Sequence, residues 1–351
     1  MLSFILATPI RAWTKQHIWD KQVTMTDQTI IVIQGAAEAS DVPGLDRISD
    51  RAEIRCAADK AALFSSLPGA DVLLGWDFRA DDIKACWGAA DSLKWVHWAG
   101  AGVDAALFPD LAGSDVTLTN SRGVFDRPMA EWTLGMMIAH AKALPETLVY
   151  QQKREWNYRH STQMLGQKVA VVGVGSIGRA VARISSAFGL DVVGVGRTAR
   201  DGDPDFGHIH GQDDLNTVLG DADYVVLITP LTATTLNLFD KSRFAAMKPG
   251  AMFINIGRGQ LVDEAAVINA LESGQVGCAA LDVFCEEPLS AANPIWAAPN
   301  VIVSPHMCGD FAEHEQALAD LFVDNFLRYQ AGEELLNVVD KASGFVPSQR
   351  A

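Results

Sequence analysis

The stretch KVAVVGVGSIG, residues 168–178, decides the fold of this chain. Its β-branched run Lys168–Val172 predicts a buried strand, and a helical pattern at Arg179–Phe188 follows three closely spaced glycines. A further strand pattern lies at Asp191–Val195. A Gly-x-Gly-x-x-Gly turn between a strand and a helix, followed by a second strand, is typical of a dinucleotide-binding βαβ unit.

Each glycine of this turn has its own physical role. Gly173 permits the tight turn, Gly175 lets the backbone approach a pyrophosphate, and Gly178 lets the helix pack closely on the strand. Ser176 and Ile177 open the helix, whose free N–H groups and positive dipole end favour phosphate. We therefore expect all five residues to contact a coenzyme, the alternative being a glycine-rich turn without a ligand.

The end of the second strand bears on which dinucleotide binds. A carboxylate placed there would hydrogen-bond the ribose 2′-hydroxyl of NAD. Here Gly196 stands eighteen residues after Gly178, and Arg197 and Thr198 follow it. A cation and a hydroxyl suit a 2′-phosphate, so we expect NADP to be preferred, with NAD as the second coenzyme.

Strand patterns alternate with helical patterns along the whole chain, which indicates an α/β fold with parallel sheets. Two series of strands are predicted. The first comprises Ile30–Gln34, Asp71–Gly75, Leu93–Trp98 and Val116–Thr119; the second comprises Lys168–Val172, Asp191–Val195, Tyr224–Thr229, Met252–Ile256, Cys278–Val283 and Val301–Ser304. Six strands with helical crossovers suit a Rossmann-type doubly wound sheet.

Two long helical patterns connect the series and predict the domain organisation. We expect Asp126–Leu144, with Asp126 as its N-cap, to join the domains and Phe311–Gln330 to return to the first. The predicted domains are an N-terminal extension (1–24), a discontinuous substrate-binding domain (25–122 and 309–345) and a dinucleotide-binding domain (123–308).

Composition excludes several classes of partner. The formal net charge is −15, which argues against nucleic acid and anionic membranes as partners. Five cysteines form no Cys-x-x-Cys pair, and this usage favours a reducing cytoplasm without a cysteine metal site. The acidic segments 201–205 and 212–214 are expected to be solvated loops, and His208 and His210 lack a nearby third metal ligand.

Polar residues follow three consecutive predicted strands of the second series. Arg258 follows the fourth strand, Glu287 the fifth and His306 the sixth. Ligands of doubly wound sheets bind beyond the carboxyl ends of the strands. Each residue alone has an ordinary structural explanation, but together they predict a catalytic cluster beside the coenzyme.

The chain resembles the D-isomer-specific 2-hydroxyacid dehydrogenase family from Met25 to about Val339. The residues that carry the resemblance are Ala101–Asp104, Asn120–Glu131, Gly173–Gly178, Pro230–Thr232, Met247–Gly250, Asn255–Gly259, Leu281–Pro288 and Ser304–His306. Two positions depart from the usual pattern: Cys308 stands where glycine is common, and Gly100 where many relatives have serine. A thiol beside the nicotinamide site would give mild sensitivity to thiol reagents.

The resemblance implies a role for each candidate residue. Arg258 would orient a 2-oxo acid, and His306, paired with Glu287, would protonate its carbonyl oxygen during reduction. The remaining implied contacts are the backbone N–H groups of Gly100, Ala101 and Gly102 for the substrate carboxylate, and Pro230, the Ile256 carbonyl and Asp282 for the coenzyme. A flavodoxin-like substrate domain, no metal and a homodimer are implied as well, with Asp126–Leu144 as the subunit contact.

We therefore expect an NAD(P)-dependent oxidoreductase acting on the CH–OH group of a small 2-hydroxy acid, with the reduction of glyoxylate or hydroxypyruvate as its reaction. Alternatives are a dehydrogenase for 3-phosphoglycerate or a bulkier 2-oxo acid, and a non-catalytic, dinucleotide-sensing binding protein of the same fold. We expect no regulatory domain after Val339, which disfavours 3-phosphoglycerate, and Glu287 disfavours a formate dehydrogenase.

Overall fold

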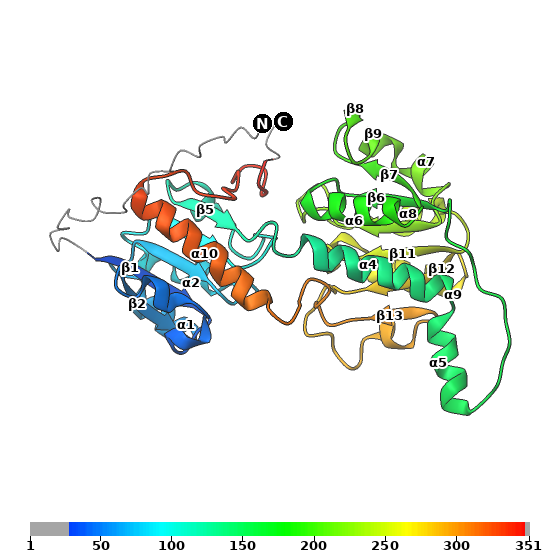
Figure 1. The fold of residues 1–351 in the computed structure, drawn as a ribbon, viewed down its shortest axis with the longest axis horizontal. Coiled ribbons are helices and arrows are strands. Elements are labelled where there is room, and N and C mark those ends of the chain that lie inside the picture. The colour runs from blue at the N-terminus through cyan, green and yellow to red at the C-terminus, as the bar shows by residue number, and fades with distance from the viewer. Residues whose placement is uncertain (1–27, 348–351) are drawn as a thin grey trace, which may run out of the picture.

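The computed structural model describes residues 28–347. It contains two parallel-stranded sheets flanked by helices, so the predicted α/β class is confirmed (Figure 1). We call the part built on the first sheet the sheet A half and the part built on the second the sheet B half. The expected N-terminal extension, residues 1–24, lies outside the described residues.

The sheet A half has a flavodoxin-like strand order, β2-β1-β3-β4-β5, with every neighbouring pair parallel. Its strands are β1 (Thr29–Gln34), β2 (Ala52–Ala57), β3 (Val72–Gly75), β4 (Trp95–Trp98) and β5 (Thr117–Asn120). One face is covered by α1 (Lys60–Ser66), α2 (Asp82–Cys86) and α3 (Pro109–Ala112), and the other by α10 (His314–Ala331). Phe322 of α10 stacks on Trp95 with ring centroids 5.5 Å apart.

The sheet B half has the order β13-β12-β11-β10-β6-β7-β9-β8, which is a doubly wound sheet with an added edge hairpin. Its strands are β6 (Lys168–Val172), β7 (Asp191–Val195), β8 (Arg200–Asp203), β9 (Gly207–His210), β10 (Tyr224–Leu227), β11 (Ala251–Asn255), β12 (Val276–Leu281) and β13 (Val301–Val303). The strand order reverses between β6 and β10, where a ligand crevice is expected.

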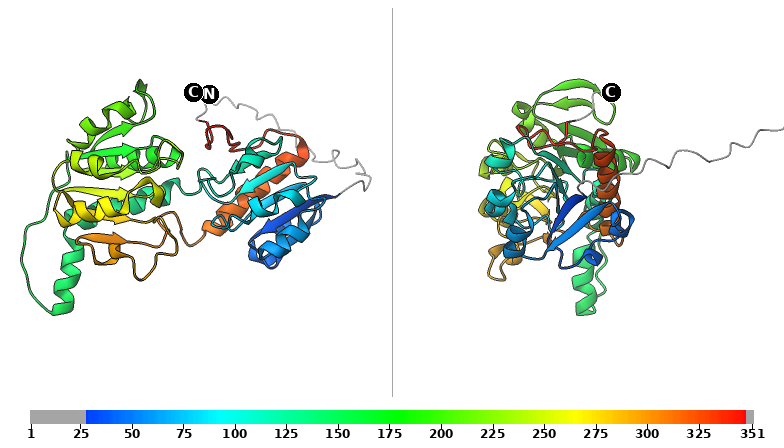
Figure 2. Two further views of the ribbon diagram at one scale, coloured as in Figure 1. Left: turned by 180° about the vertical axis from the view of Figure 1, so that it is seen from behind. Right: turned by 90° about the vertical axis from the view of Figure 1, so that its left-hand side faces the viewer.

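Helices cover both faces of the second sheet as well. On one face lie α4 (Asp126–Ala141) and α6 (Ser176–Ala187), and on the other α7 (Leu215–Leu219), α8 (Lys241–Ala246) and α9 (Glu264–Glu272). The remaining helix, α5 (Leu144–Lys153), projects away from the body of the molecule, as Figure 1 and the left view of Figure 2 show. The chain passes between the halves twice, from β5 into α4 and from β13 into α10 (Figure 1).

The joining helices differ in detail from their predicted ranges. The helix expected at Asp126–Leu144 ends at Ala141 because Ala143 adopts a left-handed conformation (φ 49°), and α5 begins after it. Asp126 is the first helical residue and not the N-cap, which is Phe125. Its carboxylate instead accepts a hydrogen bond from the Ser176 hydroxyl (3.1 Å), which links α4 to α6.

Segment 201–205 is not a solvated loop, so that prediction was wrong. It contributes to the β8–β9 hairpin, and the Arg179 guanidinium donates to Asp203 at 2.6 and 2.8 Å and to Asp205 at 2.8 Å. The Asp203 side chain is only 5% exposed, because these ion pairs compensate its burial. Segment 212–214 forms a short 3₁₀ helix.

Within residues 28–347 no helix is long and apolar enough to cross a bilayer. The same residues hold no cluster of three or more potential metal ligands. All five cysteines are free thiols.

Candidate active site

The turn between β6 and α6 has the backbone geometry that its glycines predict. Gly173 has φ 118°, and a Cβ there would lie 2.4 Å from the Ile228 carbonyl oxygen. A Cβ on Gly178 would lie 1.9 Å from the Gly173 carbonyl oxygen, so the helix packs too closely for any side chain. Gly175, the N-cap of α6, has no heavy atom within 4 Å of such a Cβ. Open space therefore lies beside Gly175 at the N-terminus of α6, where the sequence predicts a pyrophosphate.

The loop after β7 presents Arg197 and Thr198 at the surface without a neighbouring strand-end carboxylate. The Arg197 guanidinium lies 5.6 Å from the ring centroid of Phe345 in the C-terminal segment. The nearby carboxylates of Asp203 and Asp205 are engaged with Arg179 and Arg183. Arg197 forms no ion pair with any carboxylate in residues 28–347, which leaves its charge available for an anion.

Pro230 and Ile256 follow β10 and β11, beside the glycine turn that follows β6. Pro230 is exposed, whereas the Ile256 side chain is buried. Both residues therefore stand at the carboxyl edge of the sheet, on the side of the crevice where the coenzyme is expected.

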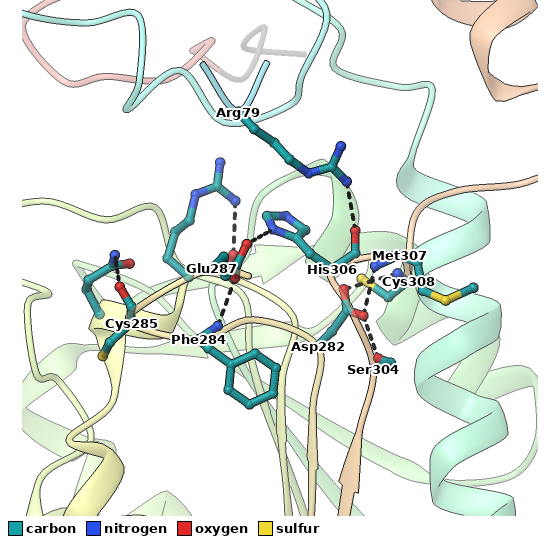
Figure 3. Close-up of polar contacts among 12 residues, drawn as sticks. Arg79, Asp282, Phe284, Cys285, Glu287, Ser304, His306, Met307 and Cys308 are labelled. Carbon is teal, nitrogen blue, oxygen red and sulfur yellow. Dashed lines mark hydrogen bonds and ion pairs between the residues drawn. The ribbon is translucent and has the colours of Figure 1, made fainter. Parts of the chain in front are cut away.

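His306 and Glu287 form a hydrogen-bonded pair at this edge (Figure 3). The imidazole Nδ1 lies 2.7 Å from Glu287 Oε2, and Glu287 Oε1 accepts from the Phe284 amide at 2.9 Å. Burial raises the pKa of the Glu287 carboxyl, but hydrogen bonds from His306 and Phe284 and the nearby positive charges outweigh it and hold the pKa below its usual value. The ionised carboxylate thus fixes the ring and leaves Nε2 free to exchange a proton.

Asp282 holds the backbone on which His306 stands. Its Oδ1 accepts from the Ser304 hydroxyl (2.5 Å) and the Met307 amide (3.0 Å), and its Oδ2 accepts from the Cys308 amide (3.0 Å) (Figure 3). The Asp282 carbonyl also accepts from the His306 amide at 2.8 Å. These bonds over-determine the left-handed backbone of His306 (φ 54°), which is uncommon for a residue other than glycine.

The Asp282 carboxylate already accepts several hydrogen bonds, so the predicted contact with a nicotinamide carboxamide would have to use a lone pair that is still free. A carboxylate has about four lone-pair positions, and three donors already occupy this one. Sequence reasoning gave Asp282 a coenzyme role and did not foresee its support of the His306 loop.

Arg258, after β11, reaches across to the sheet A half. Its Nε lies 3.0 and 3.1 Å from the two carboxylate oxygens of Asp104, its Nη2 lies 2.8 Å from Asp104 Oδ1, and its Nη1 donates to the Gly257 carbonyl at 3.0 Å. Its positive charge also helps to lower the pKa of Glu287, so the guanidinium belongs to the same cluster as the His306–Glu287 pair.

The predicted substrate loop lies beside this guanidinium. A Cβ on Gly102 would come within 2.1 Å of Arg258 Nη2, so a larger residue there would displace the guanidinium from this position. The neighbouring loop carbonyls are tied down, because Asn120 Nδ2 donates to Ala101 (2.6 Å) and the Ser121 amide donates to Gly100 (3.0 Å). The loop is thus held rigidly next to Arg258.

Two residues that the sequence analysis did not assign also reach the cluster. The Phe78 ring meets the His306 ring edge-on, with centroids 6.1 Å apart. Figure 3 shows the second contact, in which Arg79 Nη2 donates to the His306 carbonyl at 3.3 Å. Both follow β3, just as Gly100 follows β4. The strand-end rule that was applied to the second series would have found them in the first.

Cys308 is 5% exposed, and burial together with the Asp282 carboxylate raises the pKa of its thiol well above the usual range. The thiolate is the reactive form, so the expected sensitivity to thiol reagents is not supported.

Comparison with known proteins agrees with this arrangement. Residues 134–308 match the model of the NAD binding domain of the D-isomer specific 2-hydroxyacid dehydrogenases. Glyoxylate/hydroxypyruvate reductase B of Shigella boydii is 31% identical over 287 residues, which cover 80% of this chain and 86% of the relative. The chain belongs to the D-isomer specific 2-hydroxyacid dehydrogenase family. The predicted family is therefore confirmed.

Two further members of the family show the range of similarity. The D-3-phosphoglycerate dehydrogenase of Methanocaldococcus jannaschii is 30% identical over 82% of this chain, but the match spans only 55% of that relative's length. The crystal structure of NADPH-dependent glyoxylate/hydroxypyruvate reductase from Sinorhizobium meliloti, in complex with NADP and sulfate, superposes with a TM-score of 0.79 at 29% identity. The superposition covers 90% of this chain and all of that one, and it supports the two-part fold.

Proposed function

We propose that this protein reduces a small 2-oxo acid, of the glyoxylate or hydroxypyruvate type, to the D-2-hydroxy acid with NADPH. The observation that carries the proposal is the 2.7 Å contact between His306 Nδ1 and Glu287, with Arg258 in the same charge cluster. An acid and a cation together are what the reduction of a carbonyl next to a carboxylate requires.

His306 is the general acid of this reaction. Because Nδ1 is bonded to Glu287, the proton that is transferred sits on Nε2, the other ring nitrogen. The ionised Glu287 lies 2.7 Å from Nδ1 and holds the orientation of the ring. Protonating the carbonyl oxygen neutralises the negative charge that develops there as the carbon is reduced.

Arg258 and the Gly100–Gly102 loop bind and orient the substrate. The guanidinium attracts the carboxylate in a chain that is otherwise strongly acidic, and backbone N–H groups of the loop complete its coordination. Orienting the substrate before reaction converts binding energy into rate.

The coenzyme supplies a hydride from its reduced nicotinamide ring when bound. Gly173, Gly175, Ser176, Ile177 and Gly178 would hold its pyrophosphate, and Arg197 and Thr198 its 2′-phosphate. The remaining contacts would come from Pro230, the Ile256 carbonyl and Asp282. The complex of the S. meliloti relative with NADP supports the preference for NADPH over NADH.

A panel of 2-oxo acids with NADPH and NADH, followed by the loss of absorbance of the reduced coenzyme, tests the proposal. We expect turnover with glyoxylate or hydroxypyruvate, and a loss of kcat of roughly 10²–10⁴-fold in His306→Ala. Coenzyme binding by His306→Ala, measured by fluorescence, should be retained. Absence of turnover with every 2-oxo acid would favour a non-catalytic dinucleotide-sensing protein.

The panel should include 3-phosphohydroxypyruvate and bulkier 2-oxo acids. Arg79 is a second cation beside His306, and it forms no ion pair with any carboxylate in residues 28–347. It is the one observation that favours a substrate with a further anionic group, as in the D-3-phosphoglycerate dehydrogenase of M. jannaschii.

We also propose a substrate-binding domain of residues 25–122 and 309–345 and a dinucleotide-binding domain of residues 123–308. A cytoplasmic homodimer is the proposed state of the protein. The exposed apolar side chains that would suit a subunit contact lie beyond α4, on α5 and the segment after it; they are Leu144, Leu148, Val149, Trp156 and Tyr158. Sedimentation analysis tests the dimer.

A further inference from the structure

Asp104 is the carboxylate nearest to the substrate-orienting arginine, and it belongs to the other half of the molecule. It lies just after Gly102 in the loop that follows β4, whereas Arg258 follows β11. Its two oxygens lie 2.8–3.1 Å from Nε and Nη2 of Arg258. The two side chains are 37% and 24% exposed, so solvent screens this pair only in part.

The donors of the guanidinium can be counted. Arginine carries five N–H groups: one on Nε and two on each terminal nitrogen. Asp104 takes the Nε–H and its Oδ1 lies at ion-pair distance from Nη2, and the Gly257 carbonyl takes one N–H of Nη1. One N–H on Nη1 and the N–H groups of Nη2 remain, which is enough for a bidentate carboxylate.

Two more observations show that this orientation is fixed. Nη2 occupies the space where a side chain at Gly102 would stand, since a Cβ there would come within 2.1 Å of it. Burial raises the pKa of the Asp104 carboxyl, but the charge and hydrogen bonds of Arg258 outweigh it, with a contribution from His306, and keep the pKa below its usual value. Asp104 is therefore ionised at neutral pH and forms a full ion pair with the guanidinium.

We propose that Asp104 is a positioning residue that sets which N–H groups of Arg258 face the substrate. This inference rests on the proposed 2-oxo acid reduction. Asp104 does not attract the substrate, because its negative charge opposes an anionic ligand. Its contribution is to hold the guanidinium of Arg258 at one angle from the sheet A half, so that the bound carbonyl lies where His306 can protonate it.

The distinguishing prediction is a split between kcat and KM. In Asp104→Asn the guanidinium loses its charged anchor and rotates, so kcat falls by about 10–100-fold. The KM for the 2-oxo acid stays the same or falls, because a repelling charge has gone. A residue that only stabilised the fold would not produce this split.

The experiment compares wild type, Asp104→Asn, Asp104→Ala and the matched control Asp110→Asn with glyoxylate and NADPH. Asp110 is an exposed carboxylate on α3 that lies outside the cluster. Inhibition by oxamate, a non-reducible 2-oxo acid mimic, reports ligand binding independently of turnover. We expect both Asp104 variants to bind oxamate at least as tightly as wild type, and Asp110→Asn to match wild type throughout.

If either soluble Asp104 variant keeps wild-type kcat, or loses activity only through a raised KM and weaker oxamate binding, Asp104 does not position Arg258. Thermal melts establish which variants are folded. If Asp104→Ala is not folded, the result for Asp104→Asn, which is closer in shape to aspartate, decides the test. A wild-type protein without any 2-oxo acid turnover would instead overturn the proposed function, and this inference with it.

Discussion

Nδ1 of His306 lies 2.7 Å from Oε2 of Glu287, although the two residues follow different strands of the sheet B half. Glu287 also accepts from the Phe284 amide, so its carboxylate cannot turn away without leaving a buried donor unpaired. The pair therefore couples the orientation of the imidazole to the charge of the carboxylate.

Replacing that charge should change the pH profile. In Glu287→Gln the ring keeps a neighbour of the same shape but loses its anionic partner, so the acid limb of kcat that depends on the ionisation of Glu287 should disappear. We expect kcat near neutral pH to fall by roughly 10–100-fold, part of the full effect of general acid catalysis. Because the pKa of Glu287 is lowered, the wild-type carboxylate remains charged until well below its usual titration range. The profile of kcat from about pH 3.5 to 9 covers the range in which Glu287 titrates, and Glu286→Gln, an exposed neighbour, is the control. Superimposable limbs for Glu287→Gln and wild type would contradict the coupling.

Coenzyme preference should depend on Arg197. In Arg197→Ala we expect the KM for NADPH to rise by about 10–100-fold, the loss of a charge-assisted hydrogen bond, while the KM for NADH changes little. Arg243→Ala, which removes a surface arginine of α8, should leave both constants unchanged. An equal rise for the two coenzymes would mean that Arg197 does not meet the 2′-phosphate.

Gly102 should not tolerate a side chain. In Gly102→Ala the methyl group would overlap Arg258 Nη2, which forces the guanidinium or the loop to move. We expect kcat/KM for the 2-oxo acid to fall at least tenfold, with coenzyme binding preserved. Gly88→Ala, where a Cβ meets nothing within 4 Å, is the matched control. Wild-type kcat/KM in Gly102→Ala would show that the loop yields at no cost.

His97 should make stability depend on pH. Its ring is fully buried on β4, with Nδ1 2.8 Å from the Thr119 hydroxyl, and burial lowers its pKa from the usual 6.5 to about 3. Below pH 6.5 His97 is therefore protonated in the unfolded chain but stays neutral in the folded protein. Stability is complete above that pH and falls as the pH drops toward 3, at up to about 1.4 kcal/mol per pH unit.

Urea unfolding of wild type and His97→Asn at several pH values between 7.5 and 4.5 measures this contribution. Asparagine keeps an acceptor near Thr119 but cannot take up a proton, so the variant should be less stable at pH 7.5 and have a shallower pH dependence. Since all other titrating groups are shared, the difference in slope belongs to His97. Parallel curves would show that another group titrates.

Much of the fold was predictable because buried parallel strands leave a strong local pattern. The six strands of the second series and the glycine turn were predicted on runs such as Val169–Val172, which is apolar throughout because both faces of the sheet are covered. The edge strand β2 was missed because Glu53 and Arg55 alternate along it and make it resemble a polar loop. The β8–β9 hairpin was missed for a similar reason, since its acidic residues are paired with arginines of α6.

The candidate site was predictable only as a set of strand ends. The sequence placed Arg258, Glu287 and His306 after consecutive strands, and the structure brings them into one cluster. Their partners depend on contacts between segments far apart in the chain. Asp104 lies 154 residues before Arg258, and Arg79 lies 227 residues before His306. No local pattern reports such pairs, and only the topology of both sheets together places them.

The return of the chain through α10 has a consequence for the order of assembly. Phe322 and Phe326 cover a face of sheet A together with the segment of Val42, Leu45 and Ile48, yet they are synthesised after every strand of both sheets. A nascent chain can complete the sheet B half while Trp95 and its neighbours are not yet covered by α10. The sheet A half is thus the last to become native during translation. A chain that is released before residue 314 would have a folded sheet B half and a sheet A with an exposed apolar face, which favours aggregation.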